Sequence, residues 1–202
     1  MCNEAARRIA LHQLRQDWSQ LKIPLRFPEG LPNLAPLDSI RITDPTLILR
    51  ADPDGAGAEG VIRRWSWPGP TGKPVYNFRS EGRRLTNFAD GGRCLIPIDA
   101  FFEFSEPPPG AKRKSKWRFT AAPGALGFDW FCVAGLWRRD ATVGEAFTML
   151  TCEPGPDIAP YHRRQIVLPP RDAWAGWLDG SLSATDICRP TPAGSLHVEQ
   201  LR

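Results

Sequence analysis

The sequence lacks a long apolar run and lacks the closely spaced cysteines that bind zinc. A membrane-spanning helix needs about 20 consecutive apolar residues, and no stretch of this chain has them. The first twenty residues carry several charges, so they lack the apolar core of a secretory signal peptide. Cysteines at positions 2, 94, 132, 152 and 188 form no CxxC or cysteine–histidine pattern. We therefore expect a cytoplasmic protein with reduced thiols, no metal and no cofactor.

The length of 202 residues suits one domain or at most two, and 42% apolar residues provide enough material for a core. We expect a single domain, residues 1–202. The 21 prolines and 18 glycines are dispersed, which favours many short elements joined by turns. A net charge of +4 permits a polyanionic partner without requiring one.

The hydrophobic periodicity predicts more strands than helices. Apolar residues recur every three or four positions over residues 5–21, which predicts an amphipathic helix, and residues 171–178 predict a second helix. Strands are predicted for residues 39–43, 46–50, 61–65, 94–104, 116–120, 130–137, 147–152 and 165–168. Because the strands do not alternate with helices, we expect an α+β fold with a mainly antiparallel sheet or barrel and a few flanking helices.

Cys2 directly follows Met1, so removal of Met1 would leave a cysteine with a free α-amine. An α-amine with a pKa of about 7.7 to 8.0 and a thiol with a pKa near about 8.5 are both partly reactive at neutral pH. Such an aminothiol can attack a carbonyl group and can close a thiazolidine ring with an aldehyde. Alternatively, position 2 simply carries a small residue without a chemical role.

Two further segments combine ionisable residues with apolar neighbours. In VYNFRSEGRR, a strand would project Asn77 and Arg79 from one face. In RCLIPIDAFFEFSE, Glu103 interrupts a run of phenylalanines. Its carboxyl group either points to water from a strand edge or lies in an apolar pocket, where a raised pKa would suit a general acid or base.

His162 and the tryptophans at positions 65 and 67 leave two interpretations open. His162 precedes Arg163 and Arg164 and is either a functional imidazole or a surface or capping residue. Trp65 and Trp67 follow two arginines, a combination that suits stacking on unpaired bases. The alternative is that both tryptophans anchor a loop in the core.

Residues 105–116 form the least globular segment, with three consecutive prolines followed by several lysines and arginines. We expect an exposed hairpin loop between strands. The loop is either solvated or contacts phosphates.

Together these segments resemble the SOS-response-associated peptidase (SRAP) family over nearly the whole chain. The resemblance is carried, in order, by Cys2 after Met1, NLAP at 33–36, the segment around Trp65, YNFRSE from Tyr76, RCLIPIDAFFEF from Arg93, VAGLWRR from Val133, FTMLT from Phe147 and YHRRQIVLPP from Tyr161.

The resemblance implies processing of abasic sites in single-stranded DNA. The Cys2 amine would condense with the ring-opened aldehyde of the abasic deoxyribose, and its thiolate would attack the imine carbon to give a thiazolidine crosslink. Asn77 matches the residue that orients the Cys2 end, and Glu103 matches the acid that manages protons. His162 matches the histidine that assists ring opening. Removal of Met1, by self-cleavage, would account for the family name peptidase.

The resemblance also implies a DNA surface on a protein that we expect to be a monomer, associated with the nucleoid when it acts on DNA. The expected DNA contacts are Arg79 and Arg164 at phosphates beside the lesion, Trp65 and Trp67 at flanking bases, and Arg83 and Arg84. Glu4 stands where family members often have arginine, and its negative charge is expected to weaken phosphate binding. Two alternatives remain at this point: a non-covalent module that binds single-stranded nucleic acid, and a thiol amidohydrolase that acts on peptides.

Overall fold

A closed five-stranded barrel forms the centre of the computed structural model, which describes residues 2–55, 57–83, 85–107, 110, 112–126 and 128–202. Its strands are β4 (Pro45–Ala51), β5 (Ala58–Trp65), β9 (Gly91–Ile98), β12 (Phe131–Asp140) and β13 (Gly144–Cys152). They follow one another in the order β13, β12, β9, β4, β5 through antiparallel pairs, and β5 then pairs with β13 in parallel. This last pairing closes the barrel.

Short strands extend the barrel at its edges. β2 (Leu25–Arg26) pairs with β5, β14 (Gln165–Ile166) pairs with β13, and β8 (Asn77–Arg79) runs parallel to β13. A separate two-stranded ribbon, β6 (Trp67–Pro68) with β7 (Pro74–Val75), precedes β8. The chain therefore brings residues 77–79 alongside residues 149–151 of the barrel.

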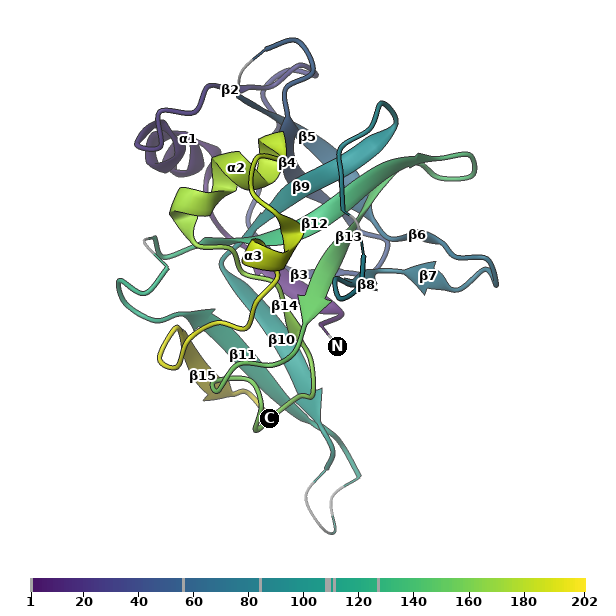
Figure 1. Ribbon diagram of the computed structural model, residues 1–202. Coiled ribbons are helices and arrows are strands. Elements are labelled where there is room, and N and C mark those ends of the chain that lie inside the picture. The colour runs from purple at the N-terminus through teal and green to yellow at the C-terminus, as the bar shows by residue number, and fades with distance from the viewer. Residues whose placement is uncertain (1, 56, 84, 108–109, 111, 127) are drawn as a thin grey trace.

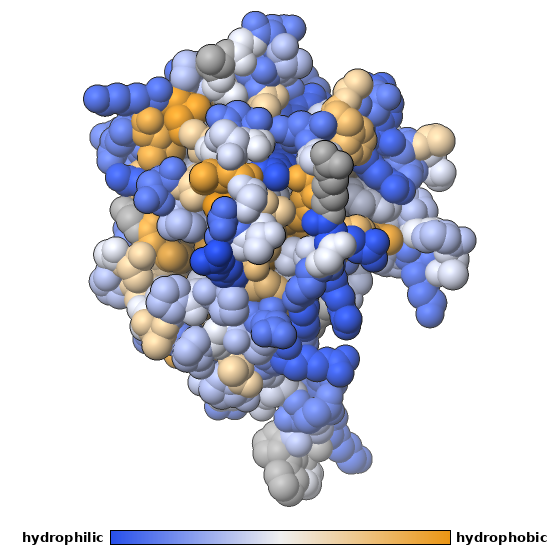
Figure 2. Space-filling model, in the orientation of Figure 1, coloured by the Kyte–Doolittle hydropathy of each residue, from blue (hydrophilic) through white to orange (hydrophobic). Residues whose placement is uncertain are grey.

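A second, five-stranded sheet packs against the barrel. Its order is β15 (Leu196–Gln200), β11 (Ser115–Ala121), β10 (Ala100–Ser105), β1 (Glu4–Arg7) and β3 (Leu37–Arg41). In Figure 1 the strands β10, β11 and β15 extend below the barrel. The hairpin that joins β10 to β11 projects farther, and Figure 2 shows a largely hydrophilic surface there. Only Asp99 separates β9 from β10, so one continuous segment passes from the barrel into this sheet.

Two apolar clusters lie on opposite faces of the barrel strands. Leu47 and Leu49 belong to a cluster shared with the helices, whereas Ile48 between them belongs to a cluster shared with the second sheet, as the two-residue period of a strand requires. The helices are α1 (Leu11–Ser19), the 3-10 helix η1 (Arg171–Ala173), α2 (Trp174–Asp179) and α3 (Ala184–Ile187). Trp18 of α1 stacks on Trp174 of α2 with ring centroids 5.6 Å apart. The helices thus pack against one face of the barrel strands, and the five-stranded sheet shares the apolar cluster on the other face.

The α+β fold with a mainly antiparallel barrel is confirmed, since strands account for 42% of the residues and helices for 11%. Each predicted strand overlaps an observed strand, although residues 94–104 form two strands and residues 167–168 lie beyond β14. The predicted helix over residues 5–21 is wrong in its first part, where β1 pairs with both β10 and β3. Pairing on both sides outweighs the local helical pattern. No described helix is long and apolar enough to cross a membrane.

The close packing of β12 against β9 and β13 gives a stability prediction at Gly135. A Cβ atom there would lie 2.5 Å from Ile96 Cδ1 and 2.6 Å from the Thr148 carbonyl oxygen. Gly135→Ala is expected to lower the free energy of unfolding by about 1 to 3 kcal/mol, measured by urea denaturation. Gly55→Ala is the control, because its nearest atom would lie 3.9 Å away. Equal stability of the two variants would contradict this account.

Candidate active site

Strand β1 holds the start of the chain inside the second sheet, between β10 and the edge strand β3. Ala5 and Ala6 are fully buried, and their small side chains let β1 lie closely between β10 and β3. Glu4 is paired with Phe102 on one side and with Arg41 on the other. Because chain ends usually fray unless they are tied into a sheet, this pairing gives Cys2 a defined position.

Cys2 is 1% exposed and contacts three parts of the structure. Its carbonyl oxygen accepts a hydrogen bond of 2.7 Å from Asn77 Nδ2. Its thiol donates to the carbonyl oxygen of Glu4 at 3.4 Å. Its backbone N–H donates to the carboxyl group of Glu103. Both the nitrogen and the sulfur of Cys2 are therefore held by named partners.

Glu103 lies on β10 and is 2% exposed. Phe101, two residues before it on the same face, belongs to the apolar cluster that contains Cys2, whereas Phe102 and Phe104 face the other side of the sheet. Burial raises the pKa of the Glu103 carboxyl to about 7, with the hydrogen bond from Cys2 acting in the opposite direction. Of the two interpretations of Glu103, the structure supports the buried carboxyl.

His162 and Glu103 line the same cleft, which has a volume of about 750 Å³. His162 is half-buried, and its Nδ1 lies 2.8 Å from the carbonyl oxygen and 3.1 Å from the backbone nitrogen of Arg164. Burial, together with the charges of Arg163 and Arg164, lowers the pKa of His162 below its ordinary value. The imidazole is therefore neutral at physiological pH and can accept a proton.

Tyr76 and Tyr161, the only tyrosines in the sequence, also line this cleft. Tyr76 immediately precedes Asn77, and Tyr161 immediately precedes His162. The Tyr161 ring lies 4.4 Å from that of Trp117 between centroids. Sequence reasoning did not select either tyrosine, although their rarity and their positions beside two candidate residues were available signals.

The thiol of Cys2 is not activated by its surroundings. Burial, and then the nearby Glu103 carboxylate, raise its pKa above the ordinary range. Burial also raises the pKa of Cys188 to about 11 and that of Cys152 to about 12. What distinguishes Cys2 from the other cysteines is therefore its backbone nitrogen beside a carboxyl group, and not the acidity of its sulfur.

The arginines predicted to contact DNA have different environments. Arg79 and Arg83 are exposed, and Arg83 lies over the Phe78 ring at 5.3 Å from its centroid. Arg164 is mostly buried and donates to both carboxylate oxygens of Glu81, at 2.5 and 2.8 Å, and to the Thr151 carbonyl oxygen at 2.8 Å. A phosphate at Arg164 would have to compete with Glu81. Arg84 lies outside the described residues.

The two tryptophans predicted to pack against bases are buried. Trp65 is fully buried, donates from its indole nitrogen to the Tyr76 carbonyl oxygen at 2.8 Å, and stacks on Phe147. This burial contradicts a direct role for Trp65 in base stacking and supports the alternative of a core anchor, which here holds Tyr76, the residue before Asn77. Trp67 is 6% exposed and lies under Arg138, 4.5 Å from its guanidinium carbon.

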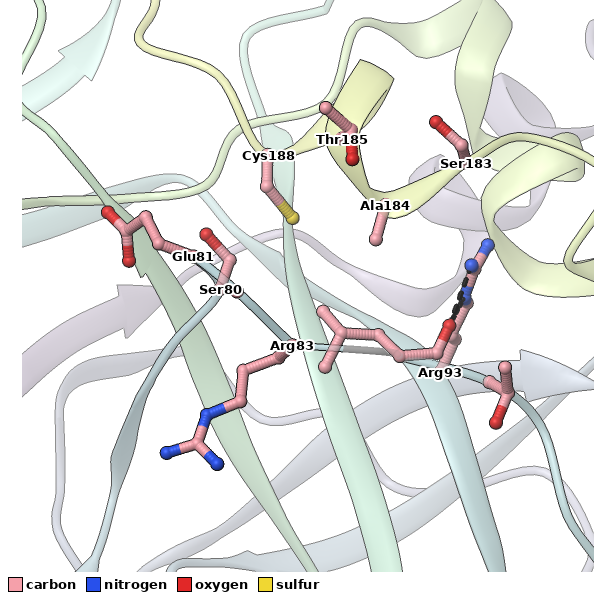
Figure 3. Close-up of a pocket in the computed structure, with 11 residues that line it drawn as sticks. Ser80, Glu81, Arg83, Arg93, Ser183, Ala184, Thr185 and Cys188 are labelled. Carbon is pink, nitrogen blue, oxygen red and sulfur yellow. Dashed lines mark hydrogen bonds between the residues drawn. The ribbon is translucent and has the colours of Figure 1, made fainter.

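A second pocket of about 580 Å³ adjoins the loop that follows β8. Figure 3 shows Ser80 of this loop beside Cys188, at the end of the segment around α3, whereas the Arg83 side chain extends away from Cys188 and Thr185. The carboxylate of Glu81 is bound by Arg164, so this loop connects the second pocket with the strand after His162. Among the described residues, no group of three or more histidine, cysteine, aspartate or glutamate side chains is arranged to hold a metal ion.

The fold and this N-terminal site define a member of the SRAP family. The family model, SOS response associated peptidase (SRAP), matches residues 1–202, and the chain belongs to this family. Membership supports a DNA-damage-related role and suggests interaction with DNA. None of the curated proteins matches the chain.

Solved structures share the fold. A protein from Bordetella bronchiseptica is similar with a TM-score of 0.72 and 23% identity, and the match covers 100% of both chains. A protein from Bacteroides thetaiotaomicron has a TM-score of 0.70 and 13% identity, over 100% of this chain and 92% of the other. A phage-related protein from Bordetella bronchiseptica has a TM-score of 0.67 and 19% identity, over 100% and 94%.

The raised pKa of Glu103 predicts a pH-dependent stability of the chain that retains Met1. Between pH 4.5, the ordinary pKa, and about 7, the unfolded state releases the Glu103 proton before the folded state does, so wild-type stability falls as pH rises. Glu103→Gln removes this loss. The difference in unfolding free energy between Glu103→Gln and wild type is therefore expected to shift by about 3 kcal/mol in favour of the variant as the pH is raised from 4 to 8. Chemical denaturation at several pH values measures it, with exposed Glu106→Gln as control. A pH-independent difference would contradict the burial argument.

Proposed function

We propose that this protein crosslinks itself through Cys2 to abasic sites in single-stranded DNA once Met1 has been removed. The observation that carries the proposal is the hydrogen bond from the Cys2 nitrogen to a buried carboxyl group whose pKa is about 7. Removal of Met1 turns that peptide nitrogen into an α-amine at the same position. Family membership and the DNA-damage-related role provide independent support.

The pairing of this amine with Glu103 suits the first bond-forming step. An α-ammonium group must lose a proton before its nitrogen can attack a carbonyl carbon. The Glu103 carboxyl has a pKa of about 7, close to the pH of a neutral medium, so it can accept this proton and return it later. The free amine then adds to the aldehyde carbon of the ring-opened deoxyribose and forms a carbinolamine.

Two further steps complete the thiazolidine. The carbinolamine hydroxyl leaves as water with the proton from Glu103, and a protonated imine remains. The Cys2 thiol then transfers its proton to the Glu103 carboxylate while the sulfur attacks the imine carbon and closes the five-membered ring. The net reaction joins aldehyde, amine and thiol with release of one water.

The order of these steps follows from the state of the thiol. Because burial raises the pKa of the Cys2 thiol, the sulfur is protonated when DNA arrives. The amine is then the first nucleophile, and the sulfur reacts only after a base has been regenerated beside it. A thiol amidohydrolase needs the sulfur to attack first as a thiolate, so the geometry supports aldehyde capture better than peptide cleavage.

Asn77 and His162 have separate roles in the proposal. Asn77 orients the Cys2 end by donating to its carbonyl oxygen at 2.7 Å. His162, neutral because burial lowers its pKa, accepts a proton from the sugar hydroxyl during ring opening. His162 lines the same cleft as Glu103, so the sugar would enter there.

The DNA strand would lie along the exposed cations beside the cleft. Arg163 lines the cleft itself, and Arg79 and Arg83 are exposed on and after β8. Arg164 would contribute by exchanging Glu81 for a phosphate or by holding the loop that carries Glu81. We propose a monomer acting in the cytoplasm on single-stranded DNA. A module that binds DNA without covalent chemistry is the second candidate, favoured by the same cations.

Covalent capture is expected to require a free N-terminal cysteine. Wild-type protein and abasic single-stranded DNA should give a band that survives denaturation without borohydride. Cys2→Ala, and protein with Met1 retained as confirmed by intact mass, should give none, because each lacks half of the aminothiol. Crosslinking by Cys2→Ala at the wild-type rate would contradict the proposal. Equal, salt-dependent affinity for intact and abasic strands without any band would support the binding module.

Glu103→Gln is expected to slow crosslinking about 10²- to 10⁴-fold, since general acid–base catalysis contributes that range, while DNA affinity changes little. Gln keeps an acceptor for the Cys2 nitrogen but cannot carry the proton. Single-turnover crosslinking at saturating DNA measures the rate, and fluorescence anisotropy measures the affinity. Glu106→Gln, also at the cleft but highly exposed, is the matched control. Parallel loss of rate and affinity in a folded Glu103→Gln variant would exclude the proton-transfer role.

A further inference from the structure

An ion pair fixes β1 on the face of its sheet that lies opposite Cys2 and Glu103. Glu4 Oε1 accepts a hydrogen bond from Lys116 Nζ at 2.8 Å and another from Ser39 Oγ at 2.9 Å. Glu4 stands directly across from Phe102, whose ring is on the face away from Glu103. The ion pair therefore holds β1 in place from the face of the sheet opposite Glu103.

Lys116 is itself held in place by aromatic rings. Its Nζ lies 4.2 Å from the centroid of Phe102 and 5.8 Å from that of Phe104, distances at which a cation is attracted to a ring face. The side chains of Lys116 and Glu4 are 21% and 10% exposed. An ion pair that is partly withdrawn from water is screened less than a surface pair, so this one can constrain both strands.

Glu4 also contacts the nucleophile directly through its backbone. Its carbonyl oxygen is the acceptor for the Cys2 thiol at 3.4 Å. The same residue thus binds the sulfur through its main chain and Lys116 through its side chain. A shift of Glu4 would move the sulfur and, one peptide earlier, the nitrogen that faces Glu103.

We infer that the Glu4–Lys116 ion pair is a positioning device for Cys2, which couples the projecting β10–β11 hairpin to the reactive end of the chain. For its effect on crosslinking, this inference rests on the proposed function. It also removes the conflict expected from a negative charge at position 4. The carboxylate is neutralised within the sheet by Lys116, and Arg41 adds further positive charge nearby.

Three variants test the inference. Lys116→Met keeps the apolar stem but leaves the Glu4 carboxylate without its lysine, and should slow crosslinking at saturating DNA about ten- to a hundredfold through misplacement of Cys2. Adding Glu4→Gln to Lys116→Met removes the uncompensated charge and should restore most of the rate. Lys116→Arg preserves the pair and should retain the wild-type rate. Arg118→Met is the control, because Arg118 lies on the same strand as Lys116 but pairs with Glu199 of β15.

Two readouts do not depend on DNA. Hydrogen exchange of the peptide covering residues 2–7 and iodoacetamide alkylation of Cys2 should both become faster in Lys116→Met and return toward wild type in the double variant. If wild-type protein forms no crosslink, the proposed function fails, and these two measurements alone decide the positioning inference. Unchanged exchange and alkylation in Lys116→Met would overturn it. Weaker DNA binding with a smaller salt dependence, and unchanged exchange, would instead identify Lys116 as a phosphate contact.

Discussion

The hydrogen bond between the Cys2 nitrogen and the buried Glu103 carboxyl is the interaction on which the rest of the site depends. It requires β1, only four residues long, to lie between two longer strands and not to fray. It also requires Glu103 to face the interior, because only burial raises its pKa to about 7. The second sheet meets both requirements because β10 pairs with β1 and carries Glu103, and because β10 directly continues barrel strand β9.

The two faces of β10 contact different groups of residues. The face with Phe101 and Glu103 belongs to the cluster that contains Cys2, so the carboxyl group is surrounded by apolar side chains. The opposite face, with Phe102 and Phe104, receives Lys116 and, through it, Glu4. Alternation along β10 thereby places the candidate reactive groups, Cys2 and Glu103, on one side of the sheet and the Glu4–Lys116 ion pair on the other. The long aromatic run around Glu103 reflects this arrangement of two apolar faces.

Much of the fold was predictable because strand propensity and turn residues are local signals. The helix over residues 5–21 failed in its first turns because the partners of β1 come from residues 37–41 and 100–102, which a local pattern does not contain. Glu103 was recognisable as a candidate, but alternation cannot tell which face of a strand is buried. Trp65 looked like a base-stacking residue beside arginines, and only its packing on Phe147 reveals a core role. Lys116 was seen as one charge in a basic run, since its pairing with Glu4 spans 112 residues.

The five cysteines share one electrostatic feature, a thiol pKa that is raised by burial. Burial is the main cause of the raised thiol pKa in Cys94, Cys132, Cys152 and Cys188. An activated sulfur would have set Cys2 apart, but its pKa is raised as well. Its distinguishing group is a nitrogen that is an unreactive amide while Met1 is attached. Removal of one residue would convert that amide into an amine beside a proton acceptor. In the proposed function, the reactivity of the site therefore depends on processing of the chain and not on the acidity of the thiol.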